Sequence, residues 1–183
     1  MKYFIDDLHS DCYIMTEILS TLEYKSGTDR YKLCKTKKGT GSIYYGTTWR
    51  GFLKYEKDGT KVFRERDKNN PNRFISKAKV DYPELEDVFK EFSKLHMKNY
   101  KYNTVMINYN YPVGWHYDKA NVGESCLVTF GDYEGGKTRL DMGCDDFKDI
   151  DCRHTPHSFD GSKIKHCVLP FTGDRWALVF FNN

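Results

Sequence analysis

The sequence predicts a mostly β fold with N-terminal helices (α+β) and a jelly-roll core. Aromatic residues make up 16% of the 183 residues, led by 14 Tyr and 12 Phe, and this composition favours strands over helical bundles. One clear helical pattern, over residues 83–97, precedes short apolar segments that are separated by Gly, Pro or Asp. Helices followed by many short strands are typical of a double-layer jelly roll with helices packed against it.

The first eighty residues are predicted to hold a short helix and a group of strands. Residues 10–21 (SDCYIMTEILST) are expected to form the helix. Apolar residues over 41–66 are interrupted by glycine, and KDGTK at 57–61 indicates a hairpin because Asp-Gly is a strong turn signal. The following DKNNPNR, residues 67–73, is predicted to be a loop.

Residues 83–97 carry the strongest helical signal. Pro83 is acceptable in a first helical turn, and Asp81 is expected to cap the helix before it. Acidic residues crowd the N-terminal end, where the helix dipole favours them. The helix should pack on a sheet, because its apolar residues follow the i, i+3, i+4, i+7 pattern: Leu85, Val88, Phe89, Phe92, Leu95 and His96.

Short strands are predicted through the remainder of the chain. They are TVMINYNY (104–111), SCLVTFGDY (125–133), GKTRLDM (136–142), KDIDCR (148–153), PHSFDG (156–161), KHCVLPF (165–171) and RWALVFF (175–181). Their close spacing indicates a sandwich or barrel.

Length and composition predict one domain, 1–183, with a basic N-terminal region (1–80) before a helix and jelly-roll core (81–183). No apolar run approaches the ~20 residues that cross a membrane, and the N-terminus lacks an apolar signal core. We therefore expect an intracellular monomer without membrane contact. The six cysteines form no CxxC pair, so reduced thiols are expected rather than disulfides or a zinc site.

Positive charge is concentrated in the N-terminal region. The chain has a net charge of +3, but residues 31–79 contain 14 Lys and Arg against 4 Asp and Glu, a local charge of +10. This asymmetry indicates a face that meets an anionic partner such as nucleic acid. The alternative is a solvated hairpin surface, since lysines on edge strands also discourage aggregation.

The segment GWHYDKAN, residues 114–121, places His116 and Asp118 two positions apart. In an extended chain these side chains project to the same face. His166 lies 48 residues after Asp118, and the intervening strands could return it to the same place. Two imidazoles and one carboxylate on one face of an iron leave three positions open, as in the facial triad of non-haem Fe(II) oxygenases. Alternatively, His116 is a structural residue, because a lone His-x-Asp is a weak signal.

Arg175 strengthens the signal of a binding site. It begins RWALVFF, nine residues after His166, and alternation puts it on one face with Ala177 and Val179. A guanidinium on an otherwise apolar strand face is costly unless it is paired. A dicarboxylate ligand would pair with it bidentately, and an internal partner such as Asp160 is the alternative.

The pattern His116-x-Asp118…His166…Arg175, in a chain of short C-terminal strands, resembles the Fe(II)/2-oxoglutarate dioxygenase family. The resemblance covers roughly residues 80–183 and implies a double-stranded β-helix, which agrees with the predicted strands. It also implies an enzyme that uses O2 to convert 2-oxoglutarate to succinate and CO2 while it hydroxylates a substrate.

The resemblance assigns a role to each of these residues. His116, Asp118 and His166 would hold Fe(II). Arg175 would bind the distal carboxylate of 2-oxoglutarate, and Thr172 in PFTGDR would add a hydroxyl near that end. The resemblance calls for no general acid or base, and none is assigned.

Within the family, the motif is most similar to TET/JBP-type nucleic-acid base oxygenases, because HYDKAN fits His-x-Asp-x-x-Asn. Asn121 would then lie near the substrate base; as an alternative it is a turn residue after the metal strand. GGKT at 135–138 resembles prolyl and lysyl hydroxylases instead. AlkB-type demethylases carry Asn-x-Tyr before the metal motif, a pattern broken in MINYNYP, and Asn108 and Tyr111 remain candidates for co-substrate contact.

The expected substrate is a pyrimidine base in nucleic acid, such as 5-methylcytosine or thymine. Phe159 and Asp160 could line its pocket, although Phe159 could equally be core. Trp49 and Arg50 could contact the base and the phosphate backbone, although for Trp49 a place in the core is preferred. Further candidates for the same contacts are Tyr44, Tyr45, Lys35, Lys37, Lys38, Lys54, Arg64, Arg66 and Arg73.

Two other functions are compatible with the sequence. The first is a protein side-chain hydroxylase of the same superfamily, acting on Pro, Lys or Asn. The second is a binding or sensor module that keeps the fold without catalysis. A complete triad with Arg175 makes the second the less favoured.

Overall fold

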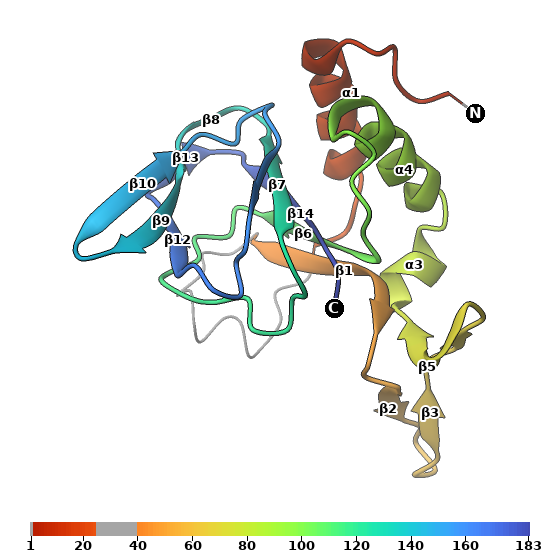
Figure 1. Cartoon of the computed structure of the whole chain (residues 1–183). Helices are drawn as coiled ribbons and strands as arrows, with labels where there is room; N and C mark the ends of the chain where they lie inside the picture. Colours follow the sequence, from red (N-terminus) through yellow and green to blue (C-terminus); the bar gives the residue numbers. More distant parts are fainter. Residues whose placement is uncertain (1, 25–39) are drawn as a thin grey trace.

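The protein is built from β-sheets with helices on one side, as the computed structural model shows for residues 2–24 and 40–183 (Figure 1). Its helices are α1 (Leu8–Ser20), α3 (Lys77–Asp81) and α4 (Leu85–His96). Its strands are β1 (Gly41–Thr48), β2 (Phe52–Tyr55), β3 (Lys61–Phe63), β4 (Arg66–Asp67), β5 (Asn70–Ile75), β6 (Thr104–Tyr109), β7 (Ser125–Phe130), β8 (Tyr133–Gly135), β9 (Thr138–Gly143), β10 (Asp146–Ile150), β11 (His157–Phe159), β12 (His166–Val168), β13 (Phe171–Gly173) and β14 (Trp176–Phe181).

Two sheets face each other across a buried interior. The larger has seven strands in the order β11-β7-β14-β6-β1-β5-β4, and the smaller has three in the order β10-β9-β12. Side chains from both sheets form one buried cluster between them: Leu127, Leu140, Ile150, Cys152, Phe159 and Ala177. The mostly β class and the jelly-roll core predicted from the sequence are therefore confirmed.

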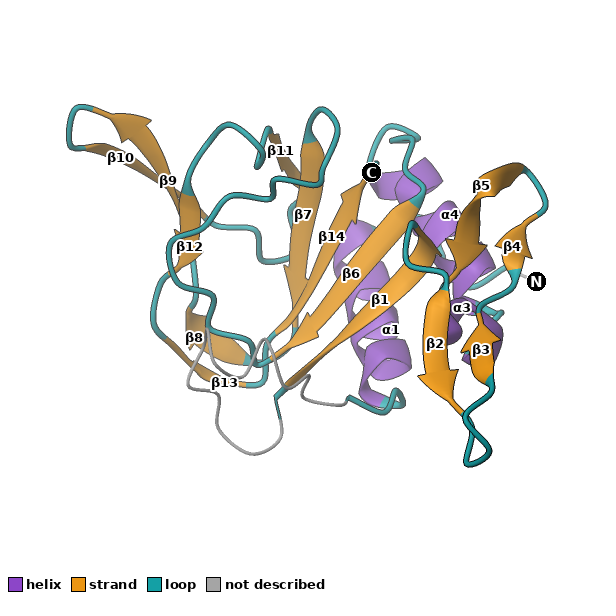
Figure 2. Cartoon of the chain, turned by 90° about the horizontal axis from the view of Figure 1, so that it is seen from below, coloured by secondary structure: helices purple, strands orange, loops and turns teal. Residues whose placement is uncertain are grey.

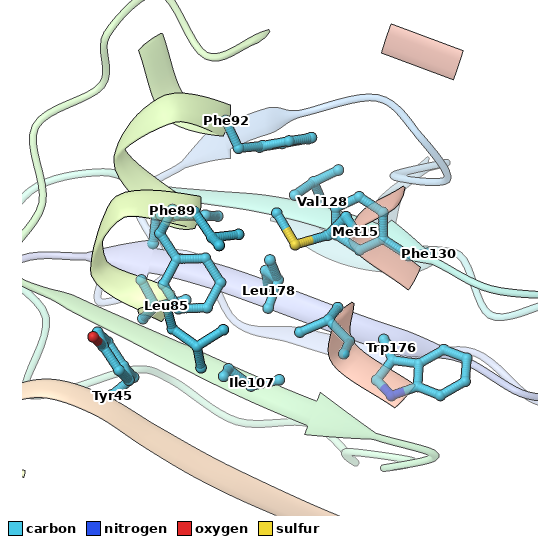
Figure 3. Packing of buried hydrophobic residues seen from close by; sticks show 14 of the residues in the cluster. Met15, Tyr45, Leu85, Phe89, Phe92, Ile107, Val128, Phe130, Trp176 and Leu178 are labelled. Carbon is cyan, nitrogen blue, oxygen red and sulfur yellow. The ribbon is translucent and has the colours of Figure 1, made fainter. Parts of the chain in front are cut away.

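Helices α1 and α4 cover the outer face of the larger sheet (Figures 1 and 2). The ring of Phe89 on α4 lies 5.4 Å from the ring of Tyr45 on β1 and 5.9 Å from that of Phe180 on β14. Met15 of α1 joins the same cluster beside the α4 side chains (Figure 3). The apolar pattern of residues 83–97 thus predicted both the helix and the face that it buries. Within the described residues, every helix is too short or too polar to cross a bilayer.

Strand β14 separates two apolar clusters. Trp176, Leu178 and Phe180 point to the helices, whereas Ala177 and Val179 point to the smaller sheet. This alternation is the period of two that a strand imposes on its side chains. The side of β14 that faces the smaller sheet carries the candidate site.

Two local predictions are wrong. Asp81 does not cap α4: it ends α3, and the residue before α4 is Glu84, which makes no side-chain capping bond. The segment DKNNPNR is not simply a loop, because residues 70–75 form β5, which pairs with β1 and β4. The turn is confined to Lys68 and Asn69, because Asp67 pairs with Asn70 across it, and a register shift between β4 and β5 accommodates Pro71.

The hairpin predicted at KDGTK is present between β2 and β3. Glu56 N donates to Thr60 O at 2.9 Å, and Gly59 adopts the positive φ of +85° that suits glycine. Part of the basic region, including Lys35, Lys37 and Lys38, lies outside the described residues.

We expect Phe89→Ala to lower the free energy of unfolding by about 3–5 kcal/mol, because the ring is fully buried between α4 and the sheet. Urea denaturation followed by circular dichroism measures the change. The control is Tyr55→Ala, which removes a ring that is 60% exposed and should change stability by less than about 0.5 kcal/mol. Equal stabilities of the two variants would contradict the packing of α4 described above.

Candidate metal centre

Main-chain hydrogen bonds bring together two segments far apart in sequence. His116 and His166 form an antiparallel bridge, with His116 N to His166 O at 2.9 Å and His166 N to His116 O at 3.0 Å. Asp118 N donates to Gly161 O at 2.8 Å. The backbone therefore fixes where all three side chains of the predicted triad begin.

The three side chains converge. One ligand atom from each of His116, Asp118 and His166 lies within 4.8 Å of the others. The Nε2 atoms of His116 and His166 lie 3.6 and 3.7 Å from the two carboxylate oxygens of Asp118. Among the described residues, this is the one group of three or more His, Cys, Asp or Glu side chains with such geometry. The convergence predicted from the sequence is therefore present.

Each imidazole is oriented by its own backbone. Nδ1 of His116 lies 2.8 Å from Gly114 O, and Nδ1 of His166 lies 2.9 Å from Ile164 O. A carbonyl accepts only from a protonated nitrogen, so in the neutral form of each ring Nδ1 carries the proton and Nε2 has the lone pair that a metal ion needs. This arrangement is the one in which protein imidazoles bind metals.

The surroundings also suit a metal ion. Burial lowers the pKa of His166, which favours the neutral ring that a metal requires. The side chains of His116 and Asp118 are about one-third exposed, so one side of the triad is open. Gly161 leaves room beside the triad: a Cβ there would lie 3.1 Å from Asp118 Oδ2 and 3.2 Å from His166 Cε1. The residues present therefore fit a divalent cation with three protein ligands.

Arg175 is buried in the same jelly roll. Only 2% of its surface is exposed, and burial lowers the pKa of its guanidinium. Its backbone is held by Asn110, whose Oδ1 accepts from Arg175 N at 2.7 Å and whose N donates to Arg175 O at 2.8 Å. Its Nε has no hydrogen-bond partner within the described residues. The predicted alternative, a pair with Asp160, is not formed: Asp160 contacts Ser162 and Lys163.

Strand β9 leads from Arg175 to the triad. A Cβ on Gly136, just before β9, would lie 3.0 Å from the Cδ and Nε of Arg175. Leu140, four residues later and about 13 Å along an extended chain, pairs with His166. Between them the hydroxyl of Thr138 is buried and lacks a partner in the described part of the chain. The Nε of Arg175 and the hydroxyl of Thr138 are thus two unpaired donors that a carboxylate ligand could satisfy.

Tyr133 completes the polar end of this interior. Its hydroxyl lies 2.6 Å from Thr129 Oγ1, and its ring centre lies 5.5 Å from the guanidinium carbon of Arg175 and 4.1 Å from that of Arg153. Tyr133, Asn110 and Gly161 were not predicted, because their roles depend on contacts with residues far along the chain. Thr138 does lie in the GGKT motif noted above.

The other residues predicted to contact the co-substrate differ in burial. Asn108 pairs in register with Ala177, so it belongs to the interior face, and its Oδ1 accepts from Ser42 Oγ at 2.6 Å. Tyr111 is buried after β6. Thr172 is exposed on β13, whereas the ring of its neighbour Phe171 lies 5.4 Å from the Arg175 guanidinium. The roles expected for Asn108, Tyr111 and Thr172 remain predictions.

Asn121 lies beside the triad. Its Nδ2 lies 3.4 Å from Asp118 Oδ2 and donates to Ser125 Oγ at 2.9 Å. Its backbone N donates to Asp118 O at 2.9 Å, as in a turn. Phe159 is buried in the interior cluster, and its ring lies 5.0 Å from the ring of His166. Phe159 is therefore both a core residue and a neighbour of the site.

Asp160, Trp49 and Arg50 lie at the surface or near it. Arg73, predicted to contact phosphate, is instead buried, with 2% of its surface exposed. Contacts with Lys163 and Ser162 lower the pKa of Asp160 to about 2. Arg50 is exposed. The preference for Trp49 as a core residue is wrong, because 62% of its surface is exposed, beyond the end of β1. Tyr45, by contrast, is 4% exposed and belongs to the core.

Comparison with known proteins identifies the fold. No protein-family model matches the sequence, and no curated protein matches it. The structure is similar to a prolyl-4-hydroxylase from Pseudomonas putida, with a TM-score of 0.50 and 12% identity over 98% of this chain and 88% of that chain. It is also similar to an oxidoreductase of the 2OG-Fe(II) oxygenase family from Burkholderia pseudomallei, with a TM-score of 0.57 and 13% identity over 93% of this chain and 76% of that chain. The similarity to OsALKBH1 has a TM-score of 0.50 and 12% identity over 99% of this chain and 93% of that chain. At such identities the likeness shows a shared fold.

We expect Gly161→Ala to weaken metal binding about tenfold or more, because the added methyl group crowds Asp118 and His166. Isothermal titration with Mn(II), which mimics Fe(II) without oxidising in air, measures the affinity. Gly114→Ala is the matched control, since a Cβ at Gly114 meets no atom within 4 Å. Equal Mn(II) affinities of the two variants would contradict the expectation that a methyl group at position 161 crowds the metal ligands.

Proposed function

We propose that the protein is an Fe(II)- and 2-oxoglutarate-dependent dioxygenase. The observation that carries the proposal is the convergence of His116, Asp118 and His166 inside a fold shared with 2OG-Fe(II) oxygenases. Fe(II) held there would supply the activation of O2 that drives hydroxylation of a substrate, while 2-oxoglutarate becomes succinate and CO2.

Each side chain of the triad has a defined task in this proposal. The Nε2 atoms of His116 and His166 and the carboxylate of Asp118 bind the metal from one side and leave the other side open. Nδ1 of each histidine keeps its proton on a backbone carbonyl, so neither ring can rotate freely. Asn121 donates to Asp118 and helps hold the carboxylate in place.

Arg175 binds the distal carboxylate of 2-oxoglutarate. A buried guanidinium without a carboxylate partner among the described residues is costly, and the ligand would provide the missing charge. The hydroxyls of Thr138 and Tyr133 are the nearby donors. Phe171 covers the guanidinium and, with the interior cluster, excludes water from the ligand.

We propose a pyrimidine base in nucleic acid, such as 5-methylcytosine or thymine, as the substrate. The TET/JBP-like motif His-x-Asp-x-x-Asn and the basic N-terminal region support this choice. Asn121 uses its Nδ2 on Asp118 and Ser125, so its carbonyl oxygen is the atom that would accept a hydrogen bond from the base. Phe159 lies against His166, where it can bound the same space.

A protein side-chain hydroxylase is the second candidate. The observation that favours it is the GGKT motif at 135–138, which resembles prolyl and lysyl hydroxylases and whose Gly136 approaches Arg175. One of the proteins with a similar fold is a prolyl-4-hydroxylase. The two candidates share the metal centre and differ only in substrate.

Succinate release from 2-oxoglutarate with Fe(II) separates the candidates. We expect methylated DNA or RNA to stimulate turnover and His116→Ala to abolish it, because the variant lacks one of the three ligands. Stimulation by a peptide pool alone would replace the substrate with a protein side chain. Absence of turnover with every substrate would refute the enzyme itself.

Arg175→Lys should raise the KM for 2-oxoglutarate about 10–100-fold, because an ammonium cannot reproduce the bidentate contact. The effect on kcat should be smaller once the co-substrate saturates the site. Arg139→Lys is the matched control, because Arg139 pairs with Asp149 at the surface. An unchanged KM in Arg175→Lys would place the co-substrate elsewhere.

A further inference from the structure

A basic aromatic hairpin projects from the sheets. We call residues 49–64 the arm: it comprises β2, β3 and their flanking residues. Strands β2 and β3 pair only with each other, and the hairpin extends away from the helices and the jelly roll (Figure 1). A two-stranded hairpin that packs against no other element cannot bury apolar side chains.

Four large rings on the arm are exposed. The exposed fractions are 62% for Trp49, 43% for Phe52, 60% for Tyr55 and 59% for Phe63. Three of them form one cluster, since the ring of Phe52 lies 5.0 Å from that of Tyr55 and 6.3 Å from that of Phe63. Exposed rings gathered on a small element mark a binding surface rather than a core.

The charge of the arm selects an anionic partner. The arm contains five Lys and Arg against two Asp and Glu. Glu56 pairs with Lys54 at 2.8 Å, and Asp58 accepts from Thr60 N within the turn. In the part of the chain that the structure describes, no ion pair joins Lys57 or Lys61 to an acid. Their ammonium groups are therefore available for phosphate.

Trp49 is held in place at the base of the arm. The guanidinium carbon of Arg73 lies 4.3 Å from the centre of the Trp49 ring, although Arg73 itself is only 2% exposed. Arg73 is fixed in turn, because its Nη1 donates to Asn183 O at 2.6 Å and its Nη2 to Thr47 O at 3.1 Å. The indole is thus braced by a cation and still largely open to solvent.

A short series of contacts connects this brace to the metal centre. Asn182, the residue before the one that Arg73 contacts, accepts from Val122 N at 2.8 Å. The neighbouring Asn121 contacts Asp118 of the triad. The loop that follows Asp118 therefore connects the triad with the end of the chain after β14, which Arg73 connects in turn with the end of β1.

We propose that the arm binds unpaired nucleotides of a single-stranded nucleic acid, next to the base that reaches the metal centre; the second half of this statement rests on the proposed function. Rings stack on bases whose faces are free, and base pairs inside a duplex offer no free faces. Lysines on the same hairpin neutralise the phosphates between those bases. Stacking and charge on one hairpin fit a single strand better than a duplex or a peptide.

Binding is measured by fluorescence anisotropy of a labelled 12-nucleotide strand, as DNA and as RNA, with the full chain and without metal or 2-oxoglutarate. We expect Trp49→Leu and Phe63→Ala each to weaken binding about 5–100-fold, the range for loss of one stacked base. The matched control is Phe147→Ala, which removes a 46% exposed ring from the other projecting hairpin. Quenching of tryptophan fluorescence by the strand should be smaller in Trp49→Leu, which keeps Trp115 and Trp176.

Charge is tested separately. Lys57→Gln and Lys61→Gln should each reduce the slope of log affinity against log salt by about 0.7, as expected for one phosphate contact on a single strand. Lys148→Gln, on the exposed strand β10, is the control. Circular dichroism checks that each variant is folded like the parent chain. Because these residues are exposed, we expect the spectra to be unchanged.

Three results would overturn the inference: arm variants that bind like Phe147→Ala, a duplex of the same sequence that binds as tightly as the strand, or peptides that compete as well as unlabelled oligonucleotide. The proposed function fails independently of the arm. A chain that binds the strand through the arm but never releases succinate would refute the enzyme and support the arm. A chain that releases succinate while its arm variants bind normally would refute only the arm.

Discussion

The pairing of His116 with His166 is the constraint on which the candidate site depends. Two reciprocal main-chain hydrogen bonds join positions fifty residues apart and place two imidazoles side by side. Strand β12 begins at His166 and pairs with β9 from Leu140 to Thr138. The position of His166 relative to the β9 residues near Arg175 is therefore set by the backbone. Because the backbone sets these positions, the side chains need only their local carbonyl contacts to present Nε2 inwards. The candidate metal centre thus depends on one antiparallel bridge that joins the irregular segment of residues 110–124 to β12.

A second constraint is the charge of Arg175 inside an apolar interior. Burial of the guanidinium costs desolvation free energy, and its Nε has no hydrogen-bond partner among the described residues to offset this cost. Asn110 holds the backbone of Arg175, and Tyr133 and Phe171 flank its side chain, so the group cannot swing out to water. In the proposed function this buried cation is organised for a carboxylate before 2-oxoglutarate binds, so the co-substrate would lose little orientational freedom on binding.

The sequence was most informative where a single local rule applies. The alternation of extended chain put His116 and Asp118 on one face, and helical periodicity identified α4 and the face that it buries. It was least informative where the outcome depends on partners far along the chain. Nothing in FDGS shows that Gly161 makes room beside two ligands, and nothing near Trp49 shows that the chain leaves the core after β1. The loop predicted for residues 67–73 was wrong for a local reason, because only Lys68 and Asn69 form the turn and Asp67 pairs with Asn70 across it.

The aromatic residues of the arm differ from those of the core in what they contact. The rings of Phe52, Tyr55 and Phe63 contact one another and solvent, while the core rings of α4 and β14 contact the sheet. A substitution at the tip of the arm therefore changes neither the register that forms the metal centre nor the packing that keeps the chain folded. If the arm and the triad have the functions proposed above, selection can alter the binding partner without altering the metal ligands or the packed core.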